Sequence, residues 1–215
     1  MLWRRSLVLL MMLVYPSISI GAASSREAMD AMDAVSIRIY DYARTDDRQL
    51  QRAADRVSAI YDQIGVRIDW RAAVKPWEIE SGRGQWPHDP PADVTLVVLA
   101  PEMVERIGVQ NDVAGYAPIS RERGGRVAYV FGERTRSIAA EAMIDESEVL
   151  AGVITHELAH LLMPGRSHSR DGVMRPHWSP AEFRSLDRER FSTSEADSIR
   201  RTIQSMGGTR SRVAD

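Results

Sequence analysis

Apolar residues recur at every second position, or fill short runs, in several segments of the chain, and this pattern is typical of β-strands. The run DVTLVVLA at 93–100 is almost continuously apolar, which predicts a strand buried on both faces of a sheet. Pro118 favours a position at the edge of a sheet for the short segment around it. We therefore expect strands at 35–40, 66–70, 93–100 and 126–131, and a short edge strand at 115–119.

Two longer segments show the helical period instead. The first starts at Thr45 or Asp46, either of which can cap a helix, and stops before Gly65. The second starts near Glu146 and carries apolar residues at helical spacing through Leu162. The order of strands and helices predicts an α/β (α+β) fold in which a five-stranded mixed sheet packs against these two helices.

The remaining segments add a long loop and two C-terminal helices. Residues 71–92 are rich in proline and glycine, which predicts a loop, and long loops in compact domains are often functional. We expect this loop to contribute walls to a binding pocket. Near the C-terminus, Ser179 can cap a helix that begins at Pro180, and a last helix is expected to begin near Thr193.

Composition narrows the classes of function. The chain has 215 residues, 44% of them hydrophobic and 27% charged, which are values of an ordinary globular domain. A domain of this size can bury a sufficient core by itself, so a bound metal would serve chemistry rather than folding. The formal net charge is −2, and this absence of a basic field argues against a nucleic-acid partner.

The N-terminus resembles an export signal. Arg4 and Arg5 precede an apolar stretch at 6–15, and the small residues 21–23 offer a cleavage site. We expect a signal peptide at 1–23, a flexible segment at 24–34 and one folded domain at 35–215, with an uncleaved anchor as the alternative to the signal peptide. The protein would then be periplasmic or secreted, with no stable membrane insertion after cleavage. The chain contains no cysteine, which is compatible with bacterial export.

Metal chemistry is concentrated in VITHELAHLLMPGRSHSRDGVMRP, residues 153–176. His156 and His160 are four positions apart on the second predicted helix, so both imidazoles project from one face and can bind one zinc ion. Glu157 would stand beside the open coordination position as a general base. This is the HExxH arrangement of zinc hydrolases.

A catalytic zinc takes a third protein ligand. Pro164 must end the helix, and Gly165 allows a turn with positive φ, which would bring His168 back toward the metal. Other candidates are a glutamate on the next helix, a turn aspartate and a histidine after the turn; these are Glu182, Asp171 and His177. His88, in the proline-rich loop, is expected to be solvated.

The stretch HELAHLLMPGRSHSRDGVM resembles the metzincin pattern, HExxHxxGxxH followed by a Met-turn. The resemblance implies a zinc endopeptidase with one catalytic Zn²⁺, ligands His156, His160 and His168, and Glu157 as the base. It also implies a supporting Met-turn residue, Met174, beneath the metal, and it implies that an extended peptide pairs with an exposed edge strand. The candidate substrate-binding residues on that strand are Gly115, Tyr116 and Ala117.

The chain departs from the metzincin pattern at two places. Gly165 follows His160 by five positions rather than three, although the GxxH step to His168 is kept. Arg175 stands directly after the Met-turn methionine, where some metzincins have a tyrosine. A tyrosine ligand or oxyanion donor is therefore not available there.

These patterns lead to three competing functions. The first is an exported zinc metallopeptidase that acts on peptide or protein substrates. The second is a non-catalytic zinc-binding module that holds a protein partner, against which the general base Glu157 argues. The third is a zinc hydrolase of a non-peptide amide.

Overall fold

The computed structural model describes residues 32–108, 113–118, 125–163, 165 and 168–213. Asp33–Asp215 form one compact unit. The predicted signal peptide at 1–23 and residues 24–31 of the predicted flexible segment lie outside the described residues. The end of that segment is not flexible loop as predicted, since Asp33 and Ala34 already belong to the first strand.

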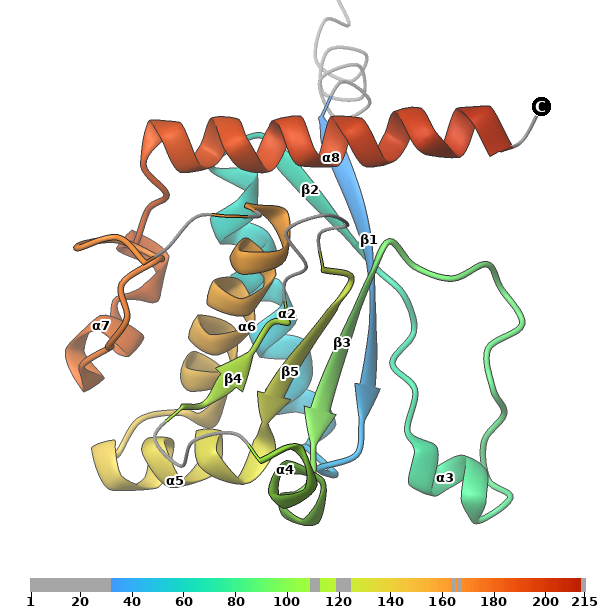
Figure 1. Ribbon diagram of the computed structural model, residues 1–215. Helices are drawn as coiled ribbons and strands as arrows, with labels where there is room; N and C mark the ends of the chain where they lie inside the picture. Colours follow the sequence, from blue (N-terminus) through green and yellow to red (C-terminus); the bar gives the residue numbers. More distant parts are fainter. Residues whose placement is uncertain (1–31, 109–112, 119–124, 164, 166–167, 214–215) are drawn as a thin grey trace, which may run out of the picture. The chain divides into compact units, whose positions relative to one another are not determined.

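A five-stranded mixed sheet forms the centre of this unit, as predicted (Figure 1). Its strand order is β2-β1-β3-β5-β4, and all neighbours are parallel except β4, which runs antiparallel to β5 at the edge. The edge strand is shorter than the predicted 115–119, and Ile119 lies outside the described residues. The strands are β1 (Asp33–Asp41), β2 (Val66–Trp70), β3 (Val94–Leu99), β4 (Gly115–Tyr116) and β5 (Val127–Phe131).

The prediction that β3 is buried on both faces is wrong. Val94, Leu96 and Val98 are fully buried, whereas Thr95 and Val97 on the opposite face are partly exposed. The difference arises because the two long helices, α2 (Asp47–Asp62) and α6 (Glu146–Leu162), cover only one face of the sheet (Figure 1). An apolar run can therefore belong to a strand that is packed by helices on one side alone.

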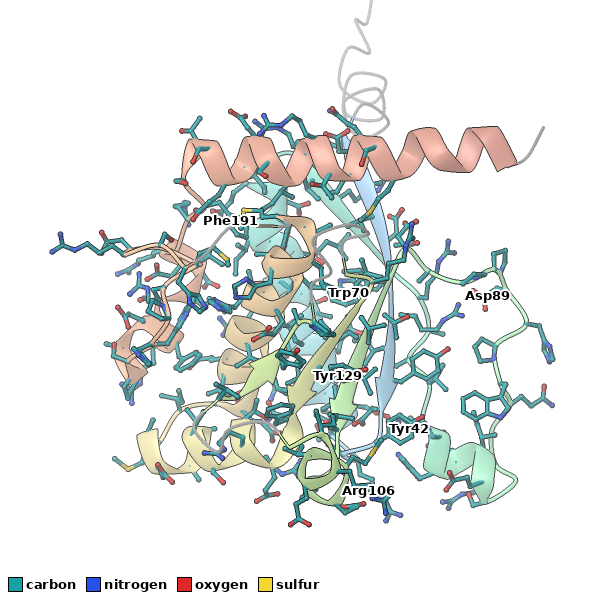
Figure 2. The ribbon with its side chains drawn as sticks, in the orientation of Figure 1. Tyr42, Trp70, Asp89, Arg106, Tyr129 and Phe191 are labelled. Atoms are coloured by element: carbon teal, nitrogen blue, oxygen red, sulfur yellow. The ribbon has the colours of Figure 1, made fainter. Side chains whose placement is uncertain are left out.

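The other face is covered in part by the long connection between β2 and β3. Arg38 of β1 is almost completely buried there and forms an ion pair with Asp89, which Figure 2 labels on that connection. Residues 71–92 are not only loop, since they contain the short helix α3 (Pro76–Glu80). Pro76 occupies the first turn of that helix, where its missing N–H is tolerated.

Two other helices were also missed from the sequence, α4 (Pro101–Ile107) and α5 (Gly132–Ala142). None of the residues in α4 is buried, and only a few in α5 are, so neither displays a continuous apolar stripe. The boundaries of the predicted long helices agree with the structure. Asp46 caps α2 by accepting from two backbone N–H groups, and Gly65 follows that helix with a φ of 72°.

The C-terminal segment closes the domain across the beginning of the sheet. It comprises α7 (Pro180–Arg184), the single 3-10 turn η1 (Leu186–Arg188) and α8 (Thr193–Val213). Ser179 and Glu182 form a capping box at the start of α7, as the Ser-Pro pair predicts. In Figure 1, α8 lies across the end of the sheet at which β1 begins, and Arg200 donates to the Ile64 carbonyl at 2.8 Å.

Helix α6 is the most deeply buried element. Thirteen of its 17 residues are buried, so the helix passes through the core instead of lying on the surface. Tyr61 of α2 is fully buried, and its hydroxyl donates to the Thr155 carbonyl at 3.1 Å, one residue before the HExxH stretch. The Tyr61 ring also packs on Phe191, labelled in Figure 2, at a centroid distance of 5.2 Å. No helix in the described part of the chain combines the length and hydropathy needed to span a bilayer.

Replacing Tyr61 with phenylalanine should measure how firmly α2 holds α6. The Tyr61→Phe variant loses one buried hydrogen bond to the Thr155 carbonyl, so we expect a loss of about 0.5–1.5 kcal/mol in the free energy of unfolding. Urea denaturation checks this value. Tyr116→Phe, at a side chain that is 42% exposed, is the control and should leave the midpoint nearly unchanged.

Candidate metal centre

The HExxH residues lie on the last two turns of α6, where the helix turns one face toward a cavity. His156 and His160 are half-buried, and their ring centroids are 4.7 Å apart. Glu157, between them in sequence, is only 7% exposed. A buried helix therefore places two imidazoles on one face and a carboxyl group beside them, as the four-residue spacing predicts.

After α6 the chain turns back toward these two histidines. Gly165 has a φ of 83°, the left-handed conformation that glycine adopts without strain. His168 then lies beside the pair, with its ring 5.0 Å from those of both His156 and His160. The two extra residues before Gly165 therefore do not prevent His168 from joining the cluster.

The three histidines face one another through their Nε2 atoms, which are 3.1, 3.2 and 3.1 Å apart. In a triangle of these sides each nitrogen is about 1.8 Å from the centre, slightly less than a zinc–nitrogen bond of about 2.0–2.1 Å. The three nitrogens are therefore close enough together to hold one ion such as zinc. This is the group of potential metal ligands found among the described residues.

The turn at 172–175 orients two of the three histidines. The Val173 carbonyl lies 3.0 Å from Nδ1 of His156, and because a carbonyl only accepts, Nδ1 must carry the proton. This leaves the lone pair of Nε2 directed into the cluster. The Met174 carbonyl accepts from the backbone N–H of Ser169 at 2.9 Å, which holds the residue next to His168. Met174 itself is fully buried.

The electrostatics of the metal-free cluster favour neutral imidazoles. Burial lowers the pKa of His156, while the hydrogen bond to Val173 acts in the opposite direction and His168 lowers it further. Burial, together with the neighbouring His156 and His168, lowers the pKa of His160 to about 4. Neutral histidines are the form that binds a metal ion.

Glu157 is held against the edge strand. A Cβ atom at Gly115 would lie 2.7 Å from both Cγ and Oε1 of Glu157 and 2.9 Å from Val153 Cγ1. Only glycine therefore allows β4 to approach this closely. Burial raises the pKa of Glu157 to about 8, so in the metal-free chain this carboxyl group is held largely protonated at neutral pH.

A cavity of about 590 Å³ opens between β4 and α6 and contains the histidine cluster. The three predicted substrate-binding residues, Gly115, Tyr116 and Ala117, all line it. The Phe131 N–H donates to the Ala114 carbonyl at 2.9 Å, which fixes the hydrogen-bond phase of the β4–β5 ladder. In this phase the backbone groups of Gly115 and Ala117 point away from β5, whereas those of Tyr116 point toward it.

Part of the cavity wall is apolar and was not predicted from the sequence. The rings of Trp178 and Phe183 stack at 5.3 Å, and a Cβ at Gly152 would lie 2.7 Å from Phe183 Cε1. Ile138 of α5 and Val153 of α6 complete this wall. The expectation that residues 71–92 form pocket walls is wrong, because the lining residues come from β4, α5, α6 and the segment that includes α7.

The other candidate ligands lie outside the cluster. Glu182 forms an ion pair with Arg175 and accepts from the Ser179 N–H, so its carboxylate is already engaged. Asp171 is an exposed residue of the turn, and His177 lines the cavity without joining the three Nε2 atoms. His88 is exposed on the β2–β3 connection.

Replacing Gly115 with alanine should disturb the carboxylate directly. The added methyl group would collide with Glu157 and Val153, so we expect the free energy of unfolding to fall by about 1–3 kcal/mol. Thermal unfolding checks this value. Tyr116→Ala is the control on the same strand, because Tyr116 is already 42% exposed, and it should destabilise the protein less.

The buried carboxyl group of Glu157 should make the stability of the metal-free protein depend on pH. The pKa of Glu157 is raised from 4.5 to about 8, so its contribution to stability is complete below pH 4.5 and is lost as the pH rises through about 8. Glutamine does not titrate, so the melting temperature of Glu157→Gln relative to the unmodified chain should increase between pH 5 and pH 8. Equal differences at both pH values, measured in a chelator, would contradict the burial of a titrating carboxyl group.

Comparisons with known proteins give a distant likeness only. No family model and no curated protein matches the sequence. Archaemetzincin from Methanopyrus kandleri is similar in structure, with a TM-score of 0.49 and 21% identity over 80% of this chain and 97% of that one. Metalloproteinase-II from Bacteroides fragilis has a TM-score of 0.45 and 10% identity, covering 80% of this chain and 53% of its own. Both TM-scores are too low to transfer a function, so the function of this chain must be argued from its own residues.

Proposed function

We propose that the protein is a zinc-dependent endopeptidase. The observation that carries this proposal is the triangle of three Nε2 atoms, 3.1–3.2 Å apart, with the carboxyl group of Glu157 on the same helix. Three imidazole nitrogens this close together can all bind one cation when each offers its lone pair. A structural zinc site would be closed by four protein ligands, whereas three ligands and a neighbouring acid are typical of a catalytic site.

Zinc is the metal that best fits these donors. Imidazole nitrogens suit zinc, copper, iron and nickel, and they are poor ligands for magnesium or calcium. His156, His160 and His168 would hold the ion while Glu157 remains free for catalysis. When bound, zinc supplies a Lewis acid that polarises a carbonyl group and lowers the pKa of a coordinated water.

Glu157 provides the proton transfers of peptide hydrolysis. Next to a dication it would act in its ionised form, because a nearby positive charge opposes the effect of burial on its pKa. It would accept a proton from the attacking water and then donate that proton to the departing amine. The close contact with Gly115 limits the positions its carboxylate can take, so the base is oriented before substrate arrives.

The edge strand would bind the substrate backbone. Gly115 and Ala117 direct their backbone groups away from β5, and both residues line the cavity that holds the histidines. An extended peptide could pair with this edge, which is the mode called β-augmentation. The substrate would therefore be a peptide or an unfolded segment of a protein. We also propose that the chain is exported, on the strength of the N-terminal signal pattern alone.

A non-catalytic zinc module is the second candidate. The cavity could hold a peptide without cleaving it, and a zinc hydrolase of a non-peptide amide would use the same groups. Glu157 has no ion-pair partner among the described residues, and burying such a carboxyl group is unfavourable. Groups of this kind are typical of functional sites, which argues against a purely binding role.

The decisive variant is Glu157→Gln. The purified protein should contain about one zinc ion per chain, measured by elemental analysis, and should cleave an unfolded protein. Loss of the base should lower the rate of cleavage by about 10²–10⁴-fold while the zinc content stays the same. His168→Ala is the complementary variant and should lose zinc as well as activity.

Three outcomes separate the candidates. Zinc binding without cleavage of a broad peptide library would favour the non-catalytic module. Cleavage of small amides but not of peptides would favour the third function. Undiminished cleavage by Glu157→Gln would remove this residue from the role of base.

A further inference from the structure

Arg175 is the most heavily engaged side chain at the rim of the cavity. It is 14% exposed and forms ion pairs with Glu182 of α7 and with Glu189, the second at 2.6 Å. Its Nε donates to the Gly172 carbonyl at 2.9 Å. The guanidinium group also lies 5.4 Å from the ring centroid of Trp178. All three nitrogens of the guanidinium group thus have partners within the protein.

These contacts join the turn at 172–175 to the segment that precedes α8. The Val173 N–H donates to the Arg190 carbonyl at 3.2 Å, next to the residue that pairs with Arg175. Gly172 has a φ of 77°, and a Cβ there would collide with the same Arg190 carbonyl oxygen. The turn and residues 189–190 are therefore in close contact. The Arg175–Glu189 ion pair is a further link between them.

The same turn orients two histidines of the cluster. Its Val173 carbonyl accepts from Nδ1 of His156, and its Met174 carbonyl accepts from the N–H of Ser169, next to His168. A shift of the turn would weaken the hydrogen bond that orients the His156 ring on α6, and it would move the chain next to His168 relative to that helix. Since groups behind a metal ligand fix its tautomer and direction, the turn has the role of a supporting shell.

Arg175 also reaches the apolar wall of the cavity. The guanidinium group lies over the ring of Trp178, which also packs against the ring of Phe183 at a centroid distance of 5.3 Å. Arg175 thus contacts both the turn that orients the histidines and an aromatic residue of the cavity wall.

We propose that Arg175 is a positioning residue that couples the three-histidine cluster to the aromatic wall of the cavity. It acts through the turn at 172–175 and touches neither metal nor substrate. This inference rests on the proposed function only in assuming that the histidines hold a metal ion. It gives a role to the residue at which the sequence departs from the metzincin pattern.

Lysine cannot replace arginine in this role. The planar fork of arginine can donate to two carboxylates and one carbonyl while its flat face stacks on an aromatic ring. An ammonium group keeps the charge but has neither the geometry nor the stacking face. Arg175→Lys therefore tests positioning with the charge held constant, and Glu189→Gln tests the same link with Arg175 intact.

Two measurements on the full chain test the proposal. The first is zinc affinity, obtained by competition with a chromophoric chelator; we expect both variants to bind zinc about 10-fold more weakly or worse. The second uses the metal-free protein, in which long-range proton–nitrogen NMR spectra report the tautomer of His156. The unmodified chain should show the Nδ1–H form, and both variants should show a mixture of tautomers.

Arg56→Lys is the matched control. Arg56 also bridges two carboxylates, Glu148 and Asp187, but it does not line the cavity, so its variant should keep zinc affinity within about 2-fold. Unchanged affinity and a single His156 tautomer in Arg175→Lys and Glu189→Gln would overturn the proposal, as would an equal loss in Arg56→Lys. If Arg175→Lys does not fold, Glu189→Gln decides; if the unmodified chain binds no zinc, the proposed function fails and the tautomer measurement alone decides the role of Arg175.

Discussion

Three imidazole nitrogens directed at one point are the constraint on which the rest of the site depends. Their Nε2 atoms lie 3.1–3.2 Å apart, a distance at which neutral rings with facing lone pairs repel one another. Only one of the three rings has its proton fixed elsewhere by a described hydrogen bond, that of His156 to the Val173 carbonyl. The three nitrogens are thus already placed to bind a cation. Backbone groups outside the histidines hold them in this arrangement.

The site is built from one rigid element and one element that is held in place by side chains. Helix α6 is rigid because most of its surface is buried, and Tyr61 holds it from the side of α2. The turn at 172–175, by contrast, is not part of a buried helix. It is held by Arg175, by the carbonyl of Arg190 and by the close approach that Gly172 allows. The chemistry therefore depends on the C-terminal segment as well as on the motif.

The sequence by itself determined the parts of the site that are local. His156, Glu157 and His160 are fixed relative to one another by helix geometry, which needs no tertiary contact, and α6 and α2 were predicted with nearly correct ends. The five strands could also be predicted, because the pattern of apolar residues along a strand is likewise a local property of the sequence. This pattern did not predict α4 or α5, because helices with few buried residues leave no apolar stripe in the sequence.

Tertiary structure alone decided how the site is completed. The sequence favoured His168 but did not exclude Glu182, Asp171 or His177. The fold brings only His168 to the pair on α6, because the chain reverses at Gly165 while Glu182 is held by Arg175. The role of the Val173 carbonyl could not be predicted from the sequence, because every residue has a backbone carbonyl group. The aromatic wall likewise joins residues distant in the chain, so its existence depends on packing and not on any local pattern.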